Sequence, residues 1–281
     1  MAAPPPPTVR LGTQGWNYSA WVGPFYPTGT RPADFLSVYA RAFGTVEVDS
    51  TFYAVPPERT VLGWAERTPP DFVFALKLPQ AVTHEARLRG ADDVLALFLE
   101  RARLLGPKLG PVLVQLGPDF GPDELPALAH FLPKLPGDVR FAVEFRRRGW
   151  LTDGVLTLLA NHGVAPALSD GKWVPRRWML ALAERFAERA PAPFAYVRWM
   201  GPNRDLVDFS RVQVDRAGEQ ARWAEAVRAM TAAAGTGVRD VYGYINNHWA
   251  GHSPASARAL QQLLGQRPVA PETLGAQLTL L

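Results

Sequence analysis

The 281-residue sequence contains no cysteine. Disulfide bonds, thiolate nucleophiles and cysteine-ligated zinc or iron–sulfur clusters are therefore excluded. Long hydrophobic runs are also missing, and no stretch is apolar for long enough to span a bilayer. The N-terminal segment MAAPPPPTVR has a proline run but no basic segment followed by an apolar core, so it does not match a secretory signal. We expect a cytoplasmic protein that has no membrane partner, with residues 1–7 as a disordered proline-rich tail.

Lysine is scarce, since only Lys77, Lys108, Lys134 and Lys172 carry an amine side chain. The net charge of +4 comes from 30 Lys plus Arg against 26 Asp plus Glu, so arginine supplies nearly all of the positive charge. Together with abundant alanine, proline and glycine, this composition is typical of codon bias in a GC-rich genome. Because arginine is also the better ligand for phosphates and stacked rings, a nucleic-acid partner stays open.

Eight short β-rich segments alternate along the chain with segments of helical periodicity. Strict alternation implies a parallel sheet, and eight such units in about 250 residues imply closure into a single (β/α)8 TIM-type barrel, residues 8–281. An open doubly wound sheet is less favoured because no glycine-rich first turn leads directly into a helix. The predicted strands are residues 8–16, 45–52, 72–79, 110–117, 140–146, 165–170, 194–201 and 240–247.

Two segments show the helix signals clearly. Trp223, Val227 and Met230 are spaced at i, i+4 and i+7, which places them on one helix face. In the segment SPASARALQQLLG, Ser253 is placed to cap a helix and Pro254 to occupy its first turn.

Polar side chains gather at the carboxyl ends of the predicted strands, where a parallel sheet covered by helices should be apolar. In a TIM-type barrel this end forms the catalytic face. Because side chains alternate along a strand, we expect the polar members to point into the barrel and converge on its mouth. Structural ion pairs, Glu47 with Lys77 and Glu144 with Arg198, are the alternative to a ligand site. The converging residues are Glu47, Lys77, Gln115, Glu144, Arg198 and Asn246.

Two carboxylates on nearby strands are the minimum for paired acid and base catalysis. A neighbouring Lys77 or Arg198 would hold one carboxylate ionised, while a dry barrel mouth would raise the pKa of the other. We therefore predict a hydrolase or lyase that acts on an anionic small molecule or a phosphodiester. The predicted roles are catalytic for Glu47, Glu144 and Lys77, and substrate-binding for Arg146, Arg198, Asn246, Asn247, Gln115, Trp16, Tyr18 and Tyr53.

A metal-assisted phosphodiesterase or nuclease is an alternative. His84 follows the third predicted strand and His248 the eighth. With Glu47, Glu144 or Asp170 they would make a mixed histidine and carboxylate site of the kind that activates water. Their spacing is not a recognised ligand motif, so a divalent metal is the less favoured version and no other cofactor is assigned.

A non-catalytic barrel that binds nucleic acid or another ligand is the second alternative. Aromatic residues crowd the predicted loops beside the basic segments RRRGW and KWVPRRW, as base stacking with phosphate neutralisation would require. We favour the simpler interpretation that these rings pack the loops over the barrel rim. The rings are Trp16, Tyr18, Trp21, Phe25, Tyr26, Phe52, Tyr53, Trp150, Trp173, Trp178, Trp199 and Trp249.

Seven ordered segments resemble the signature blocks of the YecE-like family, the domain of unknown function numbered seventy-two. The resemblance runs from about residue 10 to 265 and implies a TIM-type barrel of bacterial and archaeal origin, without an established activity. The family usually carries histidine where this chain has Met200; if that histidine is a base or ligand in relatives, the activity here is weakened or altered. The segments are GTQGWNYSAWVGPFYP, VEVDSTFYAVPP, FALKLPQAVTH, LGPKLGPVLVQLGP, AVEFRRRGW, YVRWMG and INNHWAGHSPASARAL.

Overall fold

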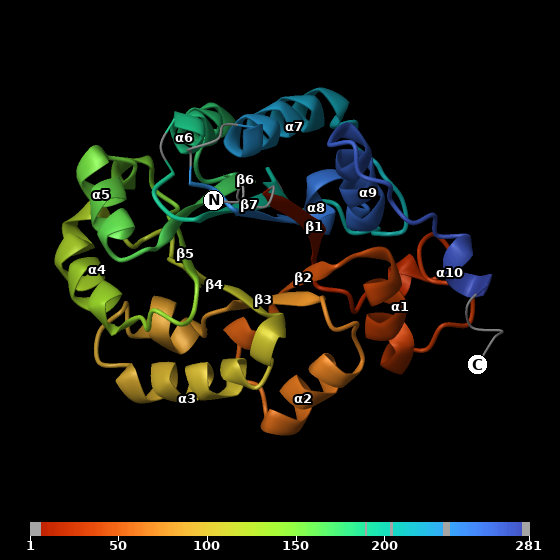
Figure 1. Ribbon diagram of the computed structural model, residues 1–281, viewed down its shortest axis with the longest axis horizontal. Helices are drawn as coiled ribbons and strands as arrows, with labels where there is room; N and C mark the ends of the chain where they lie inside the picture. Colours follow the sequence, from red (N-terminus) through yellow and green to blue (C-terminus); the bar gives the residue numbers. More distant parts are fainter. Residues whose placement is uncertain (1–6, 189, 203–204, 233–236, 277–281) are drawn as a thin grey trace, which may run out of the picture.

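Eight parallel strands close into a barrel in the order β1 to β8 in the computed structural model, which describes residues 7–188, 190–202, 205–232 and 237–276 (Figure 1). The barrel closes where β8 pairs with β1, in a register that joins Thr8 to Asp240 and Thr13 to Ile245. Residues 1–6 of the predicted tail lie outside the described residues. The strands are β1 (Thr8–Gln14), β2 (Thr45–Val48), β3 (Val73–Lys77), β4 (Leu109–Gln115), β5 (Phe141–Glu144), β6 (Ala165–Gly171), β7 (Phe194–Gly201) and β8 (Asp240–Ile245).

Helices follow the strands and form a ring around the barrel (Figure 1). The predicted apolar face of α7 is confirmed, because Trp223, Val227 and Met230 are all buried. Among the described helices, none has both the length and the apolar character needed to cross a membrane. The helices are α1 (Phe35–Ala42), α2 (Glu58–Glu66), α3 (Asp92–Arg103), α4 (Leu125–Phe131), α5 (Asp153–Asn161), α6 (Arg176–Glu188), α7 (Ala217–Ala232), α8 (Asn247–Ala250), α9 (Ser253–Leu263) and α10 (Thr273–Ala276).

The apolar residues divide into two clusters because neighbouring side chains of a strand point to opposite faces. The larger cluster includes Val143 and Val197, whose neighbours Ala142 and Tyr196 belong to the smaller one. The smaller cluster lies inside the barrel, where an eight-stranded sheet leaves room only for packed side chains.

A polar layer follows the inner cluster at the carboxyl ends of the strands. Five of its members stand two positions after an inner apolar residue and therefore point into the barrel as predicted. The steps are Ala75 to Lys77, Leu113 to Gln115, Ala142 to Glu144, Tyr196 to Arg198 and Tyr244 to Asn246.

The predicted cap of the last long helix is wrong in one residue. His252 occupies the N-cap position of α9, and Ser253 is the first residue of the helix. The hydroxyl of Ser253 donates to Oδ1 of Asn247 at 2.8 Å, and the backbone N–H of Ser253 donates to the same oxygen at 3.0 Å. Asn247 therefore satisfies the helix start, with Pro254 in the first turn as expected.

Candidate active site at the barrel mouth

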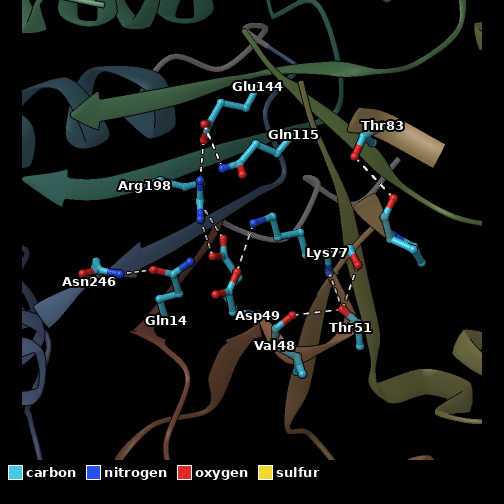
Figure 2. A network of polar contacts seen from close by, with 12 residues as sticks. Gln14, Val48, Asp49, Thr51, Lys77, Thr83, Gln115, Glu144, Arg198 and Asn246 are labelled. Carbon is cyan, nitrogen blue, oxygen red and sulfur yellow. Dashed lines mark hydrogen bonds and ion pairs between the residues drawn. The ribbon is translucent and has the colours of Figure 1, made fainter. Parts of the chain in front are cut away.

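Arg198 on β7 is the centre of a buried ion-pair network in the polar layer (Figure 2). Its Nε and Nη2 donate to Oε2 and Oε1 of Glu47 on β2 at 2.8 and 2.7 Å. Its Nη1 donates to Oε2 of Glu144 on β5 at 2.5 Å. The Tyr196 hydroxyl donates to Glu47 at 2.7 Å, and the Gln115 amide donates to Glu144 at 3.0 Å. Every carboxylate oxygen thus has a donor, which offsets the cost of burying these charges.

The network fixes the protonation state of Glu144. Burial acts to raise the pKa of Glu144, but the positive charges of Arg198 and Arg146 outweigh it and lower that pKa to about 2. Glu144 is therefore an anion at neutral pH and carries no proton to donate, so of the two roles in the predicted acid and base pair the general acid is disfavoured for it. The predicted pair of Glu144 with Arg198 is present, whereas Glu47 also pairs with Arg198 and not with Lys77.

Lys77, the last residue of β3, pairs with Asp49, which is not among the predicted site residues. Its Nζ lies 3.2 Å from Oδ1 of Asp49 and 3.6 Å from the centroid of the Phe52 ring. Burial lowers the pKa of Lys77; Asp49 opposes that shift and Arg198 adds to it. The hydroxyl of Thr51 donates to the backbone oxygen of Lys77 at 2.7 Å and so holds this strand end in place.

A cavity of about 590 Å³ opens above the network and is large enough for a small-molecule ligand. Four basic side chains line it against two acidic ones, so the cavity favours an anion. Burial and the charges of Asp49 and Glu47 raise the pKa of Tyr18 to about 12, so the phenol of this lining residue keeps its proton at neutral pH. The charged lining residues are Lys77, Arg146, Lys172, Arg198, Asp49 and Glu144.

Most of the predicted site residues lie in this cavity, but Glu47, Trp16, Asn247 and Asp170 do not. Glu47 is buried beneath it in the network, and Trp16 packs edge-on against Trp64 with ring centroids 5.9 Å apart. Asn247 is buried, and its Oδ1 accepts from Nε1 of Trp21 at 3.2 Å, so it supports the rim. The predicted residues that line the cavity are Tyr18, Tyr53, Lys77, His84, Gln115, Glu144, Arg146, Arg198, Asn246 and His248.

The predicted metal ligands are only partly brought together, because Asp170 and Glu47 do not line the cavity. The carboxylate of Asp170 accepts from Nε of Arg176 at 2.5 Å and from Nε1 of Trp223 at 2.6 Å, away from the cavity lining. Within the described ranges of the chain, no three His, Asp or Glu side chains are grouped so as to hold a metal ion. His84 and His248 line the same cavity but form no such three-residue group with a carboxylate, so the metal-assisted alternative stays a prediction.

His84 reaches the cavity through an unusual backbone. Ala81–Glu85 form a π-helical turn, and Arg87 and Leu88 follow it with φ angles of 50° and 65°. Such turns occur often at functional sites, and non-glycine residues rarely adopt positive φ. Arg87 is held by ion pairs to Asp119 and Glu124, which join this loop to the one after β4.

The aromatic residues divide between packing and exposure. Half of the twelve rings agree with the preferred interpretation, since Trp21, Phe25, Tyr26, Trp150, Trp199 and Trp249 are buried. Two rings are exposed at the rim, Tyr53 at 69% and Trp173 at 43%. They follow β2 and β6, which are four strands apart in either direction around the barrel, so they flank the mouth from opposite sides.

Asp49 and Lys172 are cavity residues with no individual role predicted from the sequence, whereas Phe52 and Trp173 were expected only among the rim aromatics. A signal was present for Asp49, because it shares the strand parity of Glu47 in the segment TVEVDSTFY. Lys172 and Trp173 begin the basic segment KWVPRRW, but nothing in the sequence shows that this loop turns toward the mouth.

A closed barrel of eight parallel strands, with a charged cavity at their carboxyl ends, defines the class of TIM-type barrel proteins. The chain belongs to the DUF72 family of proteins of unknown function, whose profile matches residues 10–277. This confirms both the predicted fold class and the predicted resemblance.

Two curated relatives are similar over part of the chain. The UPF0759 protein YecE of Escherichia coli strain K12 is 38% identical over 156 residues, which are 56% of this chain and 55% of that protein. The UPF0759 protein YunF of Bacillus subtilis strain 168 is 31% identical over 151 residues, which are 51% of this chain and 52% of that protein. The alignments thus span about half the length of these relatives.

Two solved structures support the fold. A DUF72 family protein of Thermotoga maritima MSB8 superimposes with a TM-score of 0.75 at 24% identity, covering 92% of this chain and 100% of that one. A DUF72 family protein of Enterococcus faecalis V583 gives a TM-score of 0.71 at 21% identity, covering 93% and 99%. At these identities the likeness concerns the fold alone.

Proposed function

We propose that the protein is an enzyme, a hydrolase or lyase, that acts on an anionic small molecule and transfers a proton through Lys77. The observation that carries this proposal is the position of the Lys77 amine. It lines the cavity, its side chain is 7% exposed, and burial lowers its pKa. A lysine whose pKa is lowered toward neutrality is suited to accept a proton and to return it.

In this proposal Glu47 and Glu144 position other side chains and do not act as the acid and base pair that the sequence predicts. Glu47 and Glu144 hold the Arg198 guanidinium at the bottom of the cavity, and Glu144 also orients the amide of Gln115. Asp49, 3.2 Å from the Lys77 amine, is placed to stabilise the protonated form of that amine and to pass on its proton. If Lys77 takes the proton from water, the water oxygen bonds to the substrate as the bond to the leaving group breaks, and Lys77 returns the proton to that group. If Lys77 takes the proton from carbon beside an anionic group, a carbon–carbon double bond forms as the leaving group departs with the returned proton.

A panel of phosphomonoesters, phosphodiesters and carboxylated substrates, assayed with the wild-type protein and two lysine variants, tests this proposal. Lys77→Met is expected to lower any activity found by about 100-fold or more, the usual contribution of a general base. Lys134→Met is the matched control, because Lys134 pairs with Asp92 on the surface, 2.6 Å away and outside the cavity. Full activity in Lys77→Met would overturn the role of Lys77.

A second candidate is non-catalytic binding of single-stranded nucleic acid, which the exposed Tyr53 and Trp173 rings at the rim favour. Exposed rings stack with bases, and the neighbouring Arg146 and Lys172 would contact phosphates. This candidate predicts oligonucleotide binding that weakens as the salt concentration rises, without turnover of any substrate. Binding that is insensitive to salt, or unchanged in Trp173→Ala, would count against it.

A further inference from the structure

One side of the cavity holds two cations over a single indole ring. The loop after β5 supplies Arg146, and the end of β6 leads into Lys172 and Trp173. Cζ of Arg146 lies 5.4 Å from the centroid of the Trp173 ring, and Nζ of Lys172 lies 4.5 Å from it. The indole ring attracts both cations and so helps to hold each of them beside Trp173.

The carboxylate that Arg146 contacts is shared with other side chains. Nε of Arg146 lies 3.5 Å from Oε1 of Glu144, a long contact to a carboxylate that Arg198 and Gln115 already bond. In the part of the chain that the structure describes, Lys172 forms no ion pair with an acidic side chain. Two neighbouring cations repel one another, and an anion between them would relieve that repulsion.

We propose that Arg146 and Lys172 form the subsite for a phosphate group of the substrate, with Trp173 holding both cations in position. This inference rests on the proposed function and adds which group of the substrate binds at which side of the cavity. A phosphate dianion matches two positive charges. The planar guanidinium offers two parallel hydrogen bonds, while the ammonium acts as a compact point charge.

The subsite also gives the substrate a direction in the cavity. Arg146 follows β5 and Lys172 follows β6, whereas Lys77 ends β3, and His84 lines the same cavity. The phosphate would therefore lie on the side of β5 and β6, and the reacting atoms would lie on the side of β3, near Lys77. The substrate class that fits is a small phosphomonoester whose reacting carbon or ester bond is a few atoms from the phosphate.

Calorimetric titration with inorganic phosphate tests the subsite without knowledge of the substrate. The wild-type protein is expected to bind phosphate, and Arg146→Gln and Lys172→Gln are each expected to weaken that binding about 10-fold or more, as the loss of a charge-assisted contact does. The control is Arg148→Gln, because Cζ of exposed Arg148 lies 3.8 Å from the ring of Trp178, a similar pair outside the cavity lining. Trp173→Leu is expected to weaken binding although it removes no charge.

The outcomes separate this inference from the proposed function. Absence of phosphate binding at millimolar concentration, or equal weakening by Arg148→Gln, overturns the subsite even where Lys77→Met abolishes activity. Phosphate binding that depends on Arg146 and Lys172 supports the subsite even where Lys77→Met leaves activity intact. Arg146 and Lys172 lie at the surface of the cavity, so unchanged melting temperatures are expected to show that the variants fold.

Discussion

Arg198 and Glu47 are joined inside the barrel by two parallel hydrogen bonds of 2.8 and 2.7 Å, although 151 residues separate them in the sequence. Both side chains are fully buried. A buried ion pair adds little net stability compared with apolar residues of the same shape, but removal of one partner leaves the other charge without compensation. The network is therefore a point at which a single substitution has a large effect.

Glu47→Gln is expected to lower the free energy of unfolding by about 3–5 kcal/mol, because it leaves part of the buried Arg198 charge unpaired. Urea denaturation followed by circular dichroism measures this change. Asp138→Asn is the control, because Asp138 pairs with Arg103 at the surface. The Asp138 side chain is 58% exposed and that of Arg103 is 45% exposed. This substitution is expected to cost about 1 kcal/mol or less. Equal losses in the two variants would contradict the account of the network.

Acid should remove the contribution of Glu144 to stability. Its pKa is about 2 in the folded protein against an ordinary value of 4.5. For a carboxyl whose pKa is lowered by folding, the stabilisation is complete above the unfolded-state pKa and is lost as the pH falls through the folded-state pKa. The difference corresponds to about 3 kcal/mol. Unfolding free energies at steps between pH 5 and pH 2 should fall more steeply for the wild type than for Glu144→Gln, and parallel curves would refute this.

The Lys77 amine should lose its proton at a lower pH than the other lysine side chains. Because the chain has only four lysines, NMR of protein labelled with carbon-13 at lysine Cε should give four signals. The signal absent from Lys77→Met belongs to Lys77, and Lys134→Met assigns a less buried reference, since the Lys134 side chain is 27% exposed. We expect the Lys77 signal to titrate first as the pH rises, because burial lowers its pKa. Coincident titration of Lys77 and Lys134 would remove the main support for proton transfer.

Gly201→Ala should be more damaging than the same change at another glycine of similar backbone angle. Gly201 has φ 79°, and an added Cβ would lie 2.1 Å from the backbone oxygen of His248. Gly29 has φ 85° with nothing within 4 Å of such a Cβ. Gly29→Ala is expected to cost about 1–2 kcal/mol from the left-handed conformation alone. Thermal unfolding should show a clearly larger loss for Gly201→Ala, since the start of α8 must shift.

The barrel and the inward direction of its polar residues were predictable from the sequence. The alternation of side chains is local, so Gln115, Glu144 and Arg198 could be placed on the inner face without knowledge of their partners. The order of β and α segments then determined which strands would be neighbours.

Pairing and loop placement were not predictable in the same way. β2 ends at Val48, and Asp49 adopts a helical backbone with φ −82° and ψ −22°, which is what brings it to Lys77 in place of Glu47. Asn247 was expected to face the substrate, but α8 begins at this residue and its side chain meets Trp21 instead. These outcomes depend on where a strand stops, which a pattern of residue types does not determine.

The two halves of the barrel each hold only part of the buried network. Glu47 and Gln115 belong to the first four strands, whereas Glu144 and Arg198 belong to the last four. A chain that has formed only its first half retains the Glu47 carboxylate without its guanidinium, and that carboxylate stays hydrated until β7 arrives. Closure of the barrel and dehydration of its centre are therefore one late and cooperative event of folding, set by contacts distant in sequence. If one half of this barrel were combined with a half-barrel from another protein, or with a second copy of itself, the buried charge of that half would lack its counterion.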